Sequence, residues 1–317
     1  MQIDLRFKVS HSSEFCFTTE NLSLGELKIS GGTQFIHRNE AHIAVDFEGT
    51  RAGVAAERLL LLVNGFARPR TDFRAFRKRI HSQMDSLVTV ALDNRGAGET
   101  EGGIDNLSVQ DMALDAAFVA QSFALKLGLQ KYSVLGISMG GMIAQTIAAQ
   151  DPKVESLVLV STTAGGASRI WPQGVDPEIA LQKPFEPWPQ DSELMMRRMV
   201  RYFGPRFRKT SPLLIEMMVK NMLKSHAVAS AQGRARAQYN ATVGFDGTAF
   251  ARNVACPTLV LTGTEDEIIP PENSQEICKL IKKSQLETFA DMGHLLLIED
   301  PENFVARVRC FLEGLPC

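Results

Sequence analysis

The sequence predicts an α/β fold: a mostly parallel central sheet with helices on both faces and a helical insertion. Short, nearly continuous apolar runs, such as RLLLLVNG from residue 58, are typical of parallel strands that are buried on both faces. These runs alternate with segments in which apolar residues recur every three or four positions, as they do in amphipathic helices. Strands that alternate with helices indicate a parallel sheet covered by helices.

Each element has its own signal. Residues 33–48 alternate apolar and polar positions around a polar turn at Asn39 and Glu40, which predicts an antiparallel hairpin. The buried strands are expected in residues 58–65, 87–96, 132–140, 154–163 and 256–264. Phe73, Phe76 and Ile80 lie at three- and four-residue intervals and predict a helix between the first two of these runs.

The ends of two other helices can be placed from their terminal residues. A strong amphipathic helix is expected over residues 108–128, with Ser108 as its N-cap and Gly128 as its terminator. The last helix is expected to begin with Pro301 in its first turn and to end at Gly314.

The alternation is interrupted between Thr163 and about residue 250, where no buried strand occurs. A stretch that contains proline and tryptophan is followed there by helical runs at 191–203, 212–225 and 227–241. Most connections are only about 4–6 residues long, so an insertion of this size predicts a lid or cap over the strand ends. The expected domains are a core of residues 31–164 and 250–317, a helical cap of residues 165–249, and an N-terminal extension of residues 1–30 with short strand-like pieces.

Composition excludes several classes of function. The net charge of -2 provides no field that favours nucleic acid or an anionic membrane. No apolar stretch approaches the roughly 20 residues of a membrane-spanning helix, and acidic residues interrupt the N-terminus, which argues against a secretory signal. Five irregularly spaced cysteines without a C-x-x-C pair indicate neither a zinc site nor a redox motif. We therefore expect a cytoplasmic protein that acts on a small molecule without a metal or cofactor.

The segment Gly136-Ile137-Ser138-Met139-Gly140 matches the pattern G-x-S-x-G. It lies between a predicted strand and a predicted helix, where a sharp turn lifts the serine hydroxyl outward. The start of the helix also provides free N–H groups for developing negative charge. The same letters can mark a plain small-residue turn, but the strand–turn–helix context favours Ser138 as a nucleophile.

A serine nucleophile needs a base, and in this architecture the acid and then the histidine follow the serine along the chain. His226 and His294 follow Ser138. His226 lies in a helical stretch of the insertion, which favours a structural role. His294 lies in the segment DMGH, directly after a predicted strand, and is the predicted base.

The acid is expected in the loop after the strand CPTLVLTG, because the loop after VESLVLV carries no carboxylate. That loop contains Glu265, Asp266 and Glu267. Asp266 is the predicted acid, with Glu267 as the alternative; the two glutamates also suit a solvated surface. The oxyanion donors are expected to be the backbone N–H groups of Met139, directly after the nucleophile, and of Phe66, in the loop after the strand LLLLV.

Five segments that span residues 58–314 together resemble the α/β-hydrolase superfamily, specifically its capped esterase, lactonase and carbon–carbon hydrolase group. They are NGF, LDNRGAGET, GISMGGMIA, LTGTEDEIIP and DMGHLLLIEDPENF. Many relatives carry His-Gly where this chain has Asn64-Gly65, so no histidine can act at that position. Asp93 and Arg95 resemble a structural network of the family. Dehalogenases and epoxide hydrolases of the family place aspartate at the elbow, so Ser138 indicates acyl transfer instead.

The insertion provides the remaining hints about substrate. Its methionines recur at helical spacing, and they either wall the acyl pocket or simply pack the helices. The candidate substrate-binding residues are Met142, Met195, Met199 and Met222. The cationic residues Arg197, Arg198, Arg201, Arg206, Arg208 and Lys209 either form a solvated face or steer an anionic substrate.

These observations predict a capped serine hydrolase that cleaves a carboxylic ester or related acyl compound through an acyl-enzyme. A C–C bond hydrolase or a thioesterase of the same fold is the alternative within the class. A ligand receptor or scaffold with slow or silent chemistry is the alternative from another class, because fold alone does not determine function.

Overall fold

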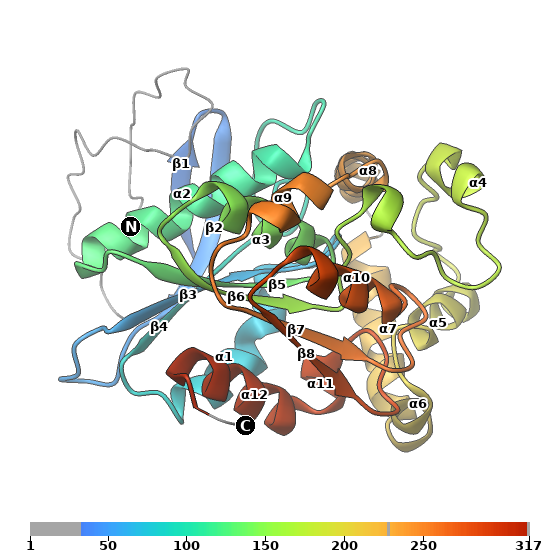
Figure 1. Cartoon of the computed structure of the whole chain (residues 1–317). Coiled ribbons are helices and arrows are strands. Elements are labelled where there is room, and N and C mark those ends of the chain that lie inside the picture. Colours follow the sequence, from blue (N-terminus) through green and yellow to red (C-terminus); the bar gives the residue numbers. More distant parts are fainter. Residues whose placement is uncertain (1–32, 227–228, 316–317) are drawn as a thin grey trace.

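The centre of the molecule is a mostly parallel sheet, as the sequence predicted (Figure 1). The computed structural model describes residues 33–226 and 229–315, and within them the sheet has eight strands in the order β1-β2-β4-β3-β5-β6-β7-β8. The strands are β1 (Gln34–Arg38), β2 (Ala41–Glu48), β3 (Arg58–Val63), β4 (Leu87–Leu92), β5 (Tyr132–Ile137), β6 (Val154–Val160), β7 (Thr258–Gly263) and β8 (Ser284–Phe289). β1 and β2 form the predicted hairpin and join the sheet antiparallel to β4, whereas the other pairs are parallel.

Strand β3 shows why continuous apolar runs form the middle of this sheet. Leu59, Leu61 and Val63 belong to the hydrophobic cluster on one face, whereas Leu60 and Leu62 belong to the cluster on the other. Successive side chains of a strand point to opposite faces, so a strand covered on both sides needs apolar residues at every position.

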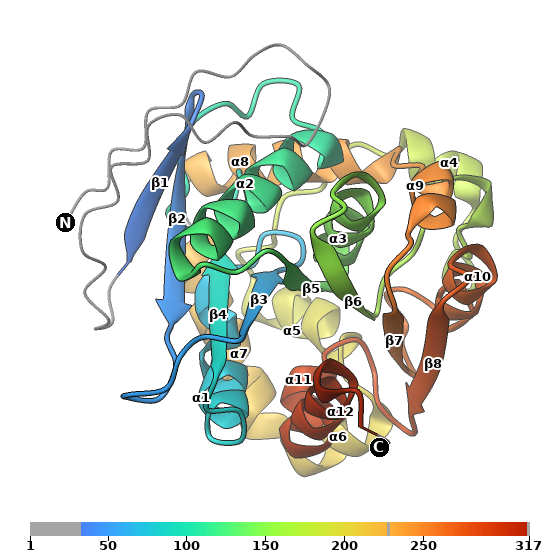
Figure 2. The same ribbon diagram turned by 60° about the vertical axis from the view of Figure 1, so that its left-hand side comes forward.

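Helices cover both faces of the sheet (Figure 2). The first cluster includes side chains of α2 (Val109–Leu127), α3 (Met139–Gln150), α9 (Thr248–Asn253) and α10 (Glu272–Leu280). The second includes side chains of α1 (Arg74–His81), α11 (Leu296–Glu299) and α12 (Pro301–Glu313). The helix predicted around Phe73 begins only at Arg74, after a short 3-10 turn (Arg70–Phe73), which leaves residues 64–69 as a loop.

The predicted helix ends are confirmed. The hydroxyl of Ser108 accepts a hydrogen bond from the Asp111 amide, and the Asp111 carboxylate accepts one from the Ser108 amide, which is a capping box. Gly128 closes α2 in the left-handed conformation, and Gly314 closes α12 in the same way.

The segment between β6 and α9 is helical, as predicted. It contains α4 (Pro177–Gln182), α5 (Ser192–Val200), α6 (Pro205–Thr210), α7 (Pro212–His226) and α8 (Ala229–Val243). Figure 1 shows α4, α5, α6 and α7 at the right-hand side of the molecule. The insertion has a hydrophobic cluster of its own, formed by Met195, Met199, Phe203, Phe207, Ile215, Val219 and Met222. Leu295 and Ile298, from outside the insertion, pack against this cluster.

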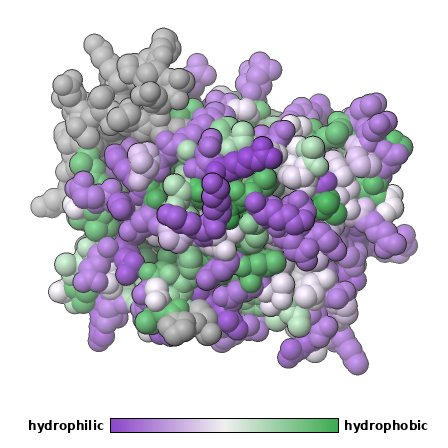
Figure 3. All heavy atoms as spheres, in the orientation of Figure 1, coloured by the Kyte–Doolittle hydropathy of each residue, from purple (hydrophilic) through white to green (hydrophobic). Residues whose placement is uncertain are grey.

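On the face shown in Figure 3, hydrophilic side chains are interspersed with small apolar areas. Among the described residues, no helix combines the length and apolar character needed to cross a membrane, and no cluster of His, Cys, Asp or Glu suits a metal ion. The strand-like pieces expected in residues 1–30 lie outside the described residues.

Candidate active site

Ser138 lies at the turn between β5 and α3 in a strained backbone conformation, with φ 55° and ψ -120°. A conformation of this kind in a residue other than glycine costs about 1–3 kcal/mol, so the surrounding structure must hold it. The Ser138 amide donates to the carbonyl of Val160 at 2.9 Å, and the Thr162 hydroxyl donates to the carbonyl of Ser138 at 2.7 Å. The end of β6 therefore anchors the turn that presents the serine to the cavity.

His294 and Asp266 form a buried pair, with Nδ1 of the ring 2.8 Å from Oδ2 of the carboxylate. The side chains are 3% and 0% exposed, respectively. An ionised carboxylate only accepts hydrogen bonds, so the ring carries its proton on Nδ1 and directs Nε2 away from Asp266. The other carboxylate oxygen accepts from the amides of Ile268 and Ile269, each at 2.9 Å. These two hydrogen bonds fix the orientation of the carboxylate, so that its Oδ2 faces His294.

Glu267, the alternative acid, makes other contacts than Asp266 does. Glu267 points to the surface, where its carboxylate pairs with Arg208 and Arg201. The hydrogen bond from Arg208 lowers the pKa of Glu267 below its ordinary value. Glu265 is exposed. The side chain of His226, at the end of α7, lies outside the described residues.

The loop that carries His294 is held against the insertion by contacts that sequence reasoning missed. The His294 amide donates to the carbonyl of Tyr202 at 2.8 Å. The carboxylate of Glu299 accepts from the amides of Gly204 and Gly293, both at 2.9 Å, and so links the insertion to the histidine loop. Burial raises the pKa of Glu299. No sequence signal marks Glu299 for this role, because its two partners lie 95 and 6 residues away.

The two amides predicted as oxyanion donors belong to the helix that follows Ser138 and to a loop close to it. Met139 is the first residue of α3, and Phe66 belongs to the loop after β3. That loop passes close to the nucleophile, since a Cβ built on Gly65 would lie 3.2 Å from Ser138 Cβ. Within residues 33–226 and 229–315, neither amide donates a hydrogen bond to a protein acceptor.

Asn64 and Asp93 shape the loop that contains Phe66. The Asn64 side chain donates to the carbonyl of Pro69 at 2.9 Å and accepts from the Gly65 amide at 2.8 Å. The fully buried Asp93 accepts from the Arg70 amide at 2.5 Å and also pairs with the Arg70 guanidinium. Asn64 thus organises this loop through its side-chain hydrogen bonds. Arg95 is ion-paired with the buried Asp115.

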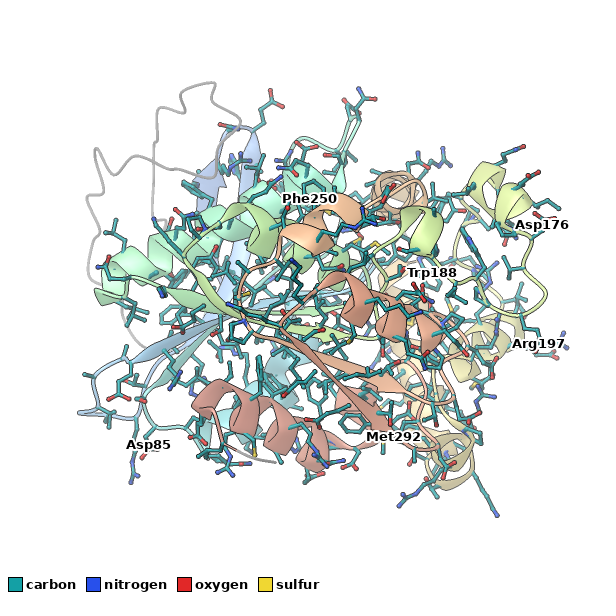
Figure 4. The ribbon with its side chains drawn as sticks, viewed as in Figure 1. Asp85, Asp176, Trp188, Arg197, Phe250 and Met292 are labelled. Carbon is teal, nitrogen blue, oxygen red and sulfur yellow. The ribbon has the colours of Figure 1, made fainter. Side chains whose placement is uncertain are left out.

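Ser138 and His294 line one cavity of about 870 Å³. Met139, Met142, Met199 and Met222 also line it, whereas Met195 does not contribute to the described lining and is buried within the insertion cluster. Sequence reasoning did not single out several other lining residues: Arg169, Trp188, Tyr202, Arg234 and Tyr239. Trp188 lies in the connection before α5 (Figure 4), and its ring stacks on that of Phe66, with the centroids 6.0 Å apart.

The model of the alpha/beta hydrolase fold family matches residues 59–301. The chain belongs to the α/β-hydrolase family. This result confirms the resemblance inferred from the motifs, and the hydrolases among its relatives indicate that the chain is an α/β-hydrolase enzyme.

This α/β-hydrolase is similar to proteins that are named as a lactonase, a dienoate hydrolase and an esterase. The chain is 23% identical to a 3-oxoadipate enol-lactonase of Acinetobacter baylyi over 236 residues, which cover 74% of this chain and 82% of the relative. It is 30% identical to a 2-hydroxy-6-oxo-2,4-heptadienoate hydrolase of Pseudomonas putida over 59% of this chain and 65% of that one. A solved esterase of Thermogutta terrifontis superposes with a TM-score of 0.65 at 26% identity, over 86% of this chain and 94% of the esterase.

The nucleophile turn of this α/β-hydrolase predicts a stability effect at Gly140. A Cβ at this position would lie 2.1 Å from the backbone oxygen of Val63, which cannot move aside as a flexible side chain does. We expect Gly140→Ala to lower the free energy of unfolding by about 1–3 kcal/mol. The same change at Gly233, a helical position with no atom within 4 Å of the added carbon, should raise it by about 0.5–1 kcal/mol. Urea unfolding measures both; equal effects would show that the turn tolerates a side chain.

Proposed function

We propose that this α/β-hydrolase is a serine hydrolase that cleaves a carboxylic ester or a related acyl compound. Ser138 is the nucleophile, His294 the base and Asp266 the residue that orients it. The observation that carries the proposal is the buried 2.8 Å contact between His294 and Asp266, at the edge of a cavity that the strained Ser138 also lines. A histidine held in this way has Nε2 available to accept the serine proton.

The proposed reaction uses only groups of this chain and water. Ser138 Oγ attacks the acyl carbon while its proton passes to His294 Nε2, and the carbonyl oxygen becomes an oxyanion. The amides of Phe66 and Met139 donate to that oxyanion. His294 then returns the proton to the leaving group, which departs and leaves an acyl-serine. Water, deprotonated by His294, hydrolyses the acyl-serine and regenerates the enzyme.

A graded set of p-nitrophenyl esters, with and without a serine-reactive phosphonate, tests the proposed function. We expect repeated turnover that the phosphonate abolishes, with one phosphonyl group attached to Ser138. A single burst of p-nitrophenol without turnover would instead favour a receptor with slow chemistry. Turnover that resists the phosphonate would exclude the proposed nucleophile.

We propose further that residues 165–249 act as a cap that sets acyl-chain selectivity. Met199 and Met222 line the cavity from the insertion, so Met199→Ala and Met222→Ala are expected to shift the preferred acyl chain to longer lengths. Each lost contact changes the discrimination between acyl chains of different length by about 1–3 kcal/mol. Met195→Ala is the matched control, because Met195 is equally buried but outside the described lining. It should lower stability and leave the chain-length profile of kcat/KM unchanged.

A C–C bond hydrolase is the second candidate, favoured by the 30% identity to the heptadienoate hydrolase of Pseudomonas putida. The two candidates have the same fold and the same proposed nucleophile, and they differ in the bond that is cleaved. Turnover of a 2-hydroxy-6-oxo-dienoate at a higher kcat/KM than any p-nitrophenyl ester would favour the C–C hydrolase.

A further inference from the structure

The cavity beside Ser138 is lined by three arginines, two of which pair with no carboxylate of the described residues. Arg68, Arg169 and Arg234 all line it. Arg68 is ion-paired with Asp72 at 2.6 Å. By contrast, no carboxylate of the described residues pairs with Arg169 or Arg234.

The surroundings of Arg169 and Arg234 compensate their charge and their hydrogen-bond donors only in part. The guanidinium of Arg169 lies 3.8 Å from the ring centroid of Trp171, which attracts a cation but offers no negative charge. Burial lowers the pKa of Arg169, because leaving water disfavours the charged form. Nε of Arg234 is buried and has no hydrogen-bond partner in the described residues. A buried N–H donor without a partner is costly, and an anion beside it would remove that cost.

The cations of the outer surface differ from this pair. Arg197 pairs with Glu193, and Arg198 pairs with Glu186. Arg201 and Arg208 both pair with Glu267. Carboxylates therefore neutralise most of the arginines of the 197–208 segment, whereas no carboxylate of the described residues pairs with Arg169 or Arg234.

We propose that Arg169 and Arg234 form a carboxylate subsite, so that the substrate is an acyl compound that bears a free carboxylate away from the scissile bond. This inference rests on the proposed function of Ser138. The planar guanidinium matches a carboxylate in two-point hydrogen bonds. The lining is otherwise rich in methionine and aromatic residues, so a singly charged carboxylate loses its water there at lower cost than a doubly charged phosphate.

Two esters of the same carbon count test the subsite: the mono-p-nitrophenyl ester of glutarate and p-nitrophenyl pentanoate. We expect the wild-type protein to prefer the glutarate monoester in kcat/KM by at least about tenfold. Arg169→Gln and Arg234→Gln should each lower kcat/KM for the glutarate monoester by about 10- to 100-fold, and change that for the pentanoate by less than about threefold. Arg197→Gln is the matched control, since Arg197 points outward from α5 (Figure 4) and should affect neither ester.

A binding measurement separates the subsite from the chemistry. Free glutarate should bind the Ser138→Ala variant in calorimetry, and Arg169→Gln added to that variant should remove the binding. If the wild-type protein hydrolyses the pentanoate at Ser138 without preferring the glutarate monoester, the subsite is wrong and the proposed function stands. If neither ester is cleaved, glutarate binding that depends on Arg169 still supports the subsite, and its absence overturns it.

Gln238 of α8 makes an independent contact between the insertion and the loop of Phe66. Its side chain is fully buried. Its Oε1 accepts from the Ala67 amide at 2.7 Å, and its Nε2 donates to the carbonyl of Arg95 at 2.7 Å. One carboxamide thus bridges the loops that follow β3 and β4. Ala67 has a φ of 55°, a conformation that an alanine holds only when its neighbours impose it.

The position of Ala67 makes this bridge relevant to catalysis. Ala67 directly follows Phe66, whose amide is a proposed oxyanion donor, so the Phe66–Ala67 peptide group is fixed by the bond to Gln238. We infer that Gln238 is a positioning residue that couples the insertion to the oxyanion hole, if Phe66 acts as proposed. Displacement of α8 would release the loop and reduce stabilisation of the oxyanion.

Gln238→Met tests this inference against Gln121→Met. Gln121 is also a buried glutamine, and it donates to Asp151 at 2.7 Å away from the cavity. Both variants should lose stability, but only Gln238→Met should lower kcat, by about 10- to 100-fold with KM little changed. Gln238→Glu retains the oxygen that accepts from Ala67 but loses the donor to the carbonyl of Arg95, so its kcat should lie between those of the wild type and Gln238→Met. It also tests the contact with Ala67 if the methionine variant does not fold.

Amide hydrogen exchange gives a readout that does not depend on turnover. Exchange in residues 64–69 should accelerate in Gln238→Met and stay unchanged in Gln121→Met. Unchanged exchange in both would overturn the bridge itself. Faster exchange with an unaltered kcat in an active enzyme would overturn its link to catalysis.

Discussion

Replacing Ser138 by alanine is expected to lower kcat for ester hydrolysis by about 10⁴- to 10⁶-fold while the protein stays folded. The hydroxyl is the proposed nucleophile, and without it no acyl-enzyme forms. Alanine and serine face similar backbone strain at φ 55°, so the turn should persist. Steady-state kinetics with p-nitrophenyl esters measures the loss, and circular dichroism checks the fold.

Ser161→Ala is the matched control for this change. Ser161 follows β6, is buried and also has a positive φ, of 46°. Its side chain is not part of the described cavity lining, so its removal should change kcat by less than about twofold. If Ser138→Ala retained more than a tenth of wild-type activity, Ser138 would not be the nucleophile.

Replacing Asp266 by asparagine is expected to lower kcat by about 10³- to 10⁴-fold. Asparagine keeps the shape of the side chain but presents an NH₂ group where the carboxylate accepted, so the imidazole can be held in the wrong tautomer. The imidazolium that forms as Ser138 loses its proton also loses its partner charge. KM should change much less than kcat, because Asp266 is buried behind His294 and is not among the cavity-lining residues. Steady-state kinetics over a range of pH measures both constants.

Glu265→Gln and Glu267→Gln are the neighbouring controls, and each should cost less than about tenfold in kcat. Glu267 is partly exposed and paired with arginines of the insertion, and exposed ion pairs contribute little. A severe loss in Glu267→Gln together with a mild one in Asp266→Asn would assign the acid to Glu267.

The sequence alone determined the features that depend on near neighbours along the chain. Continuous apolar runs located the strands, and Ser108, Asp111 and Gly128 define a helix through hydrogen bonds within a few residues of its ends. The turn at Ser138 has its signal in five consecutive residues. Chain order and loop composition then predicted Asp266 as the acid and His294 as the base, and the structure places their side chains 2.8 Å apart.

Only the tertiary structure decided which side chains face the cavity. Met195 and Met199 both lie on the buried side of α5, yet Met199 alone of the two lines the cavity, because helical periodicity identifies a buried side but not what covers it. The Gln238–Ala67 bond joins residues 171 positions apart, and Glu299 reaches Gly204 across 95. Contacts of this kind arise from the packing of the insertion onto the strand ends. No local pattern encodes them, because the residues that meet lie far apart along the chain.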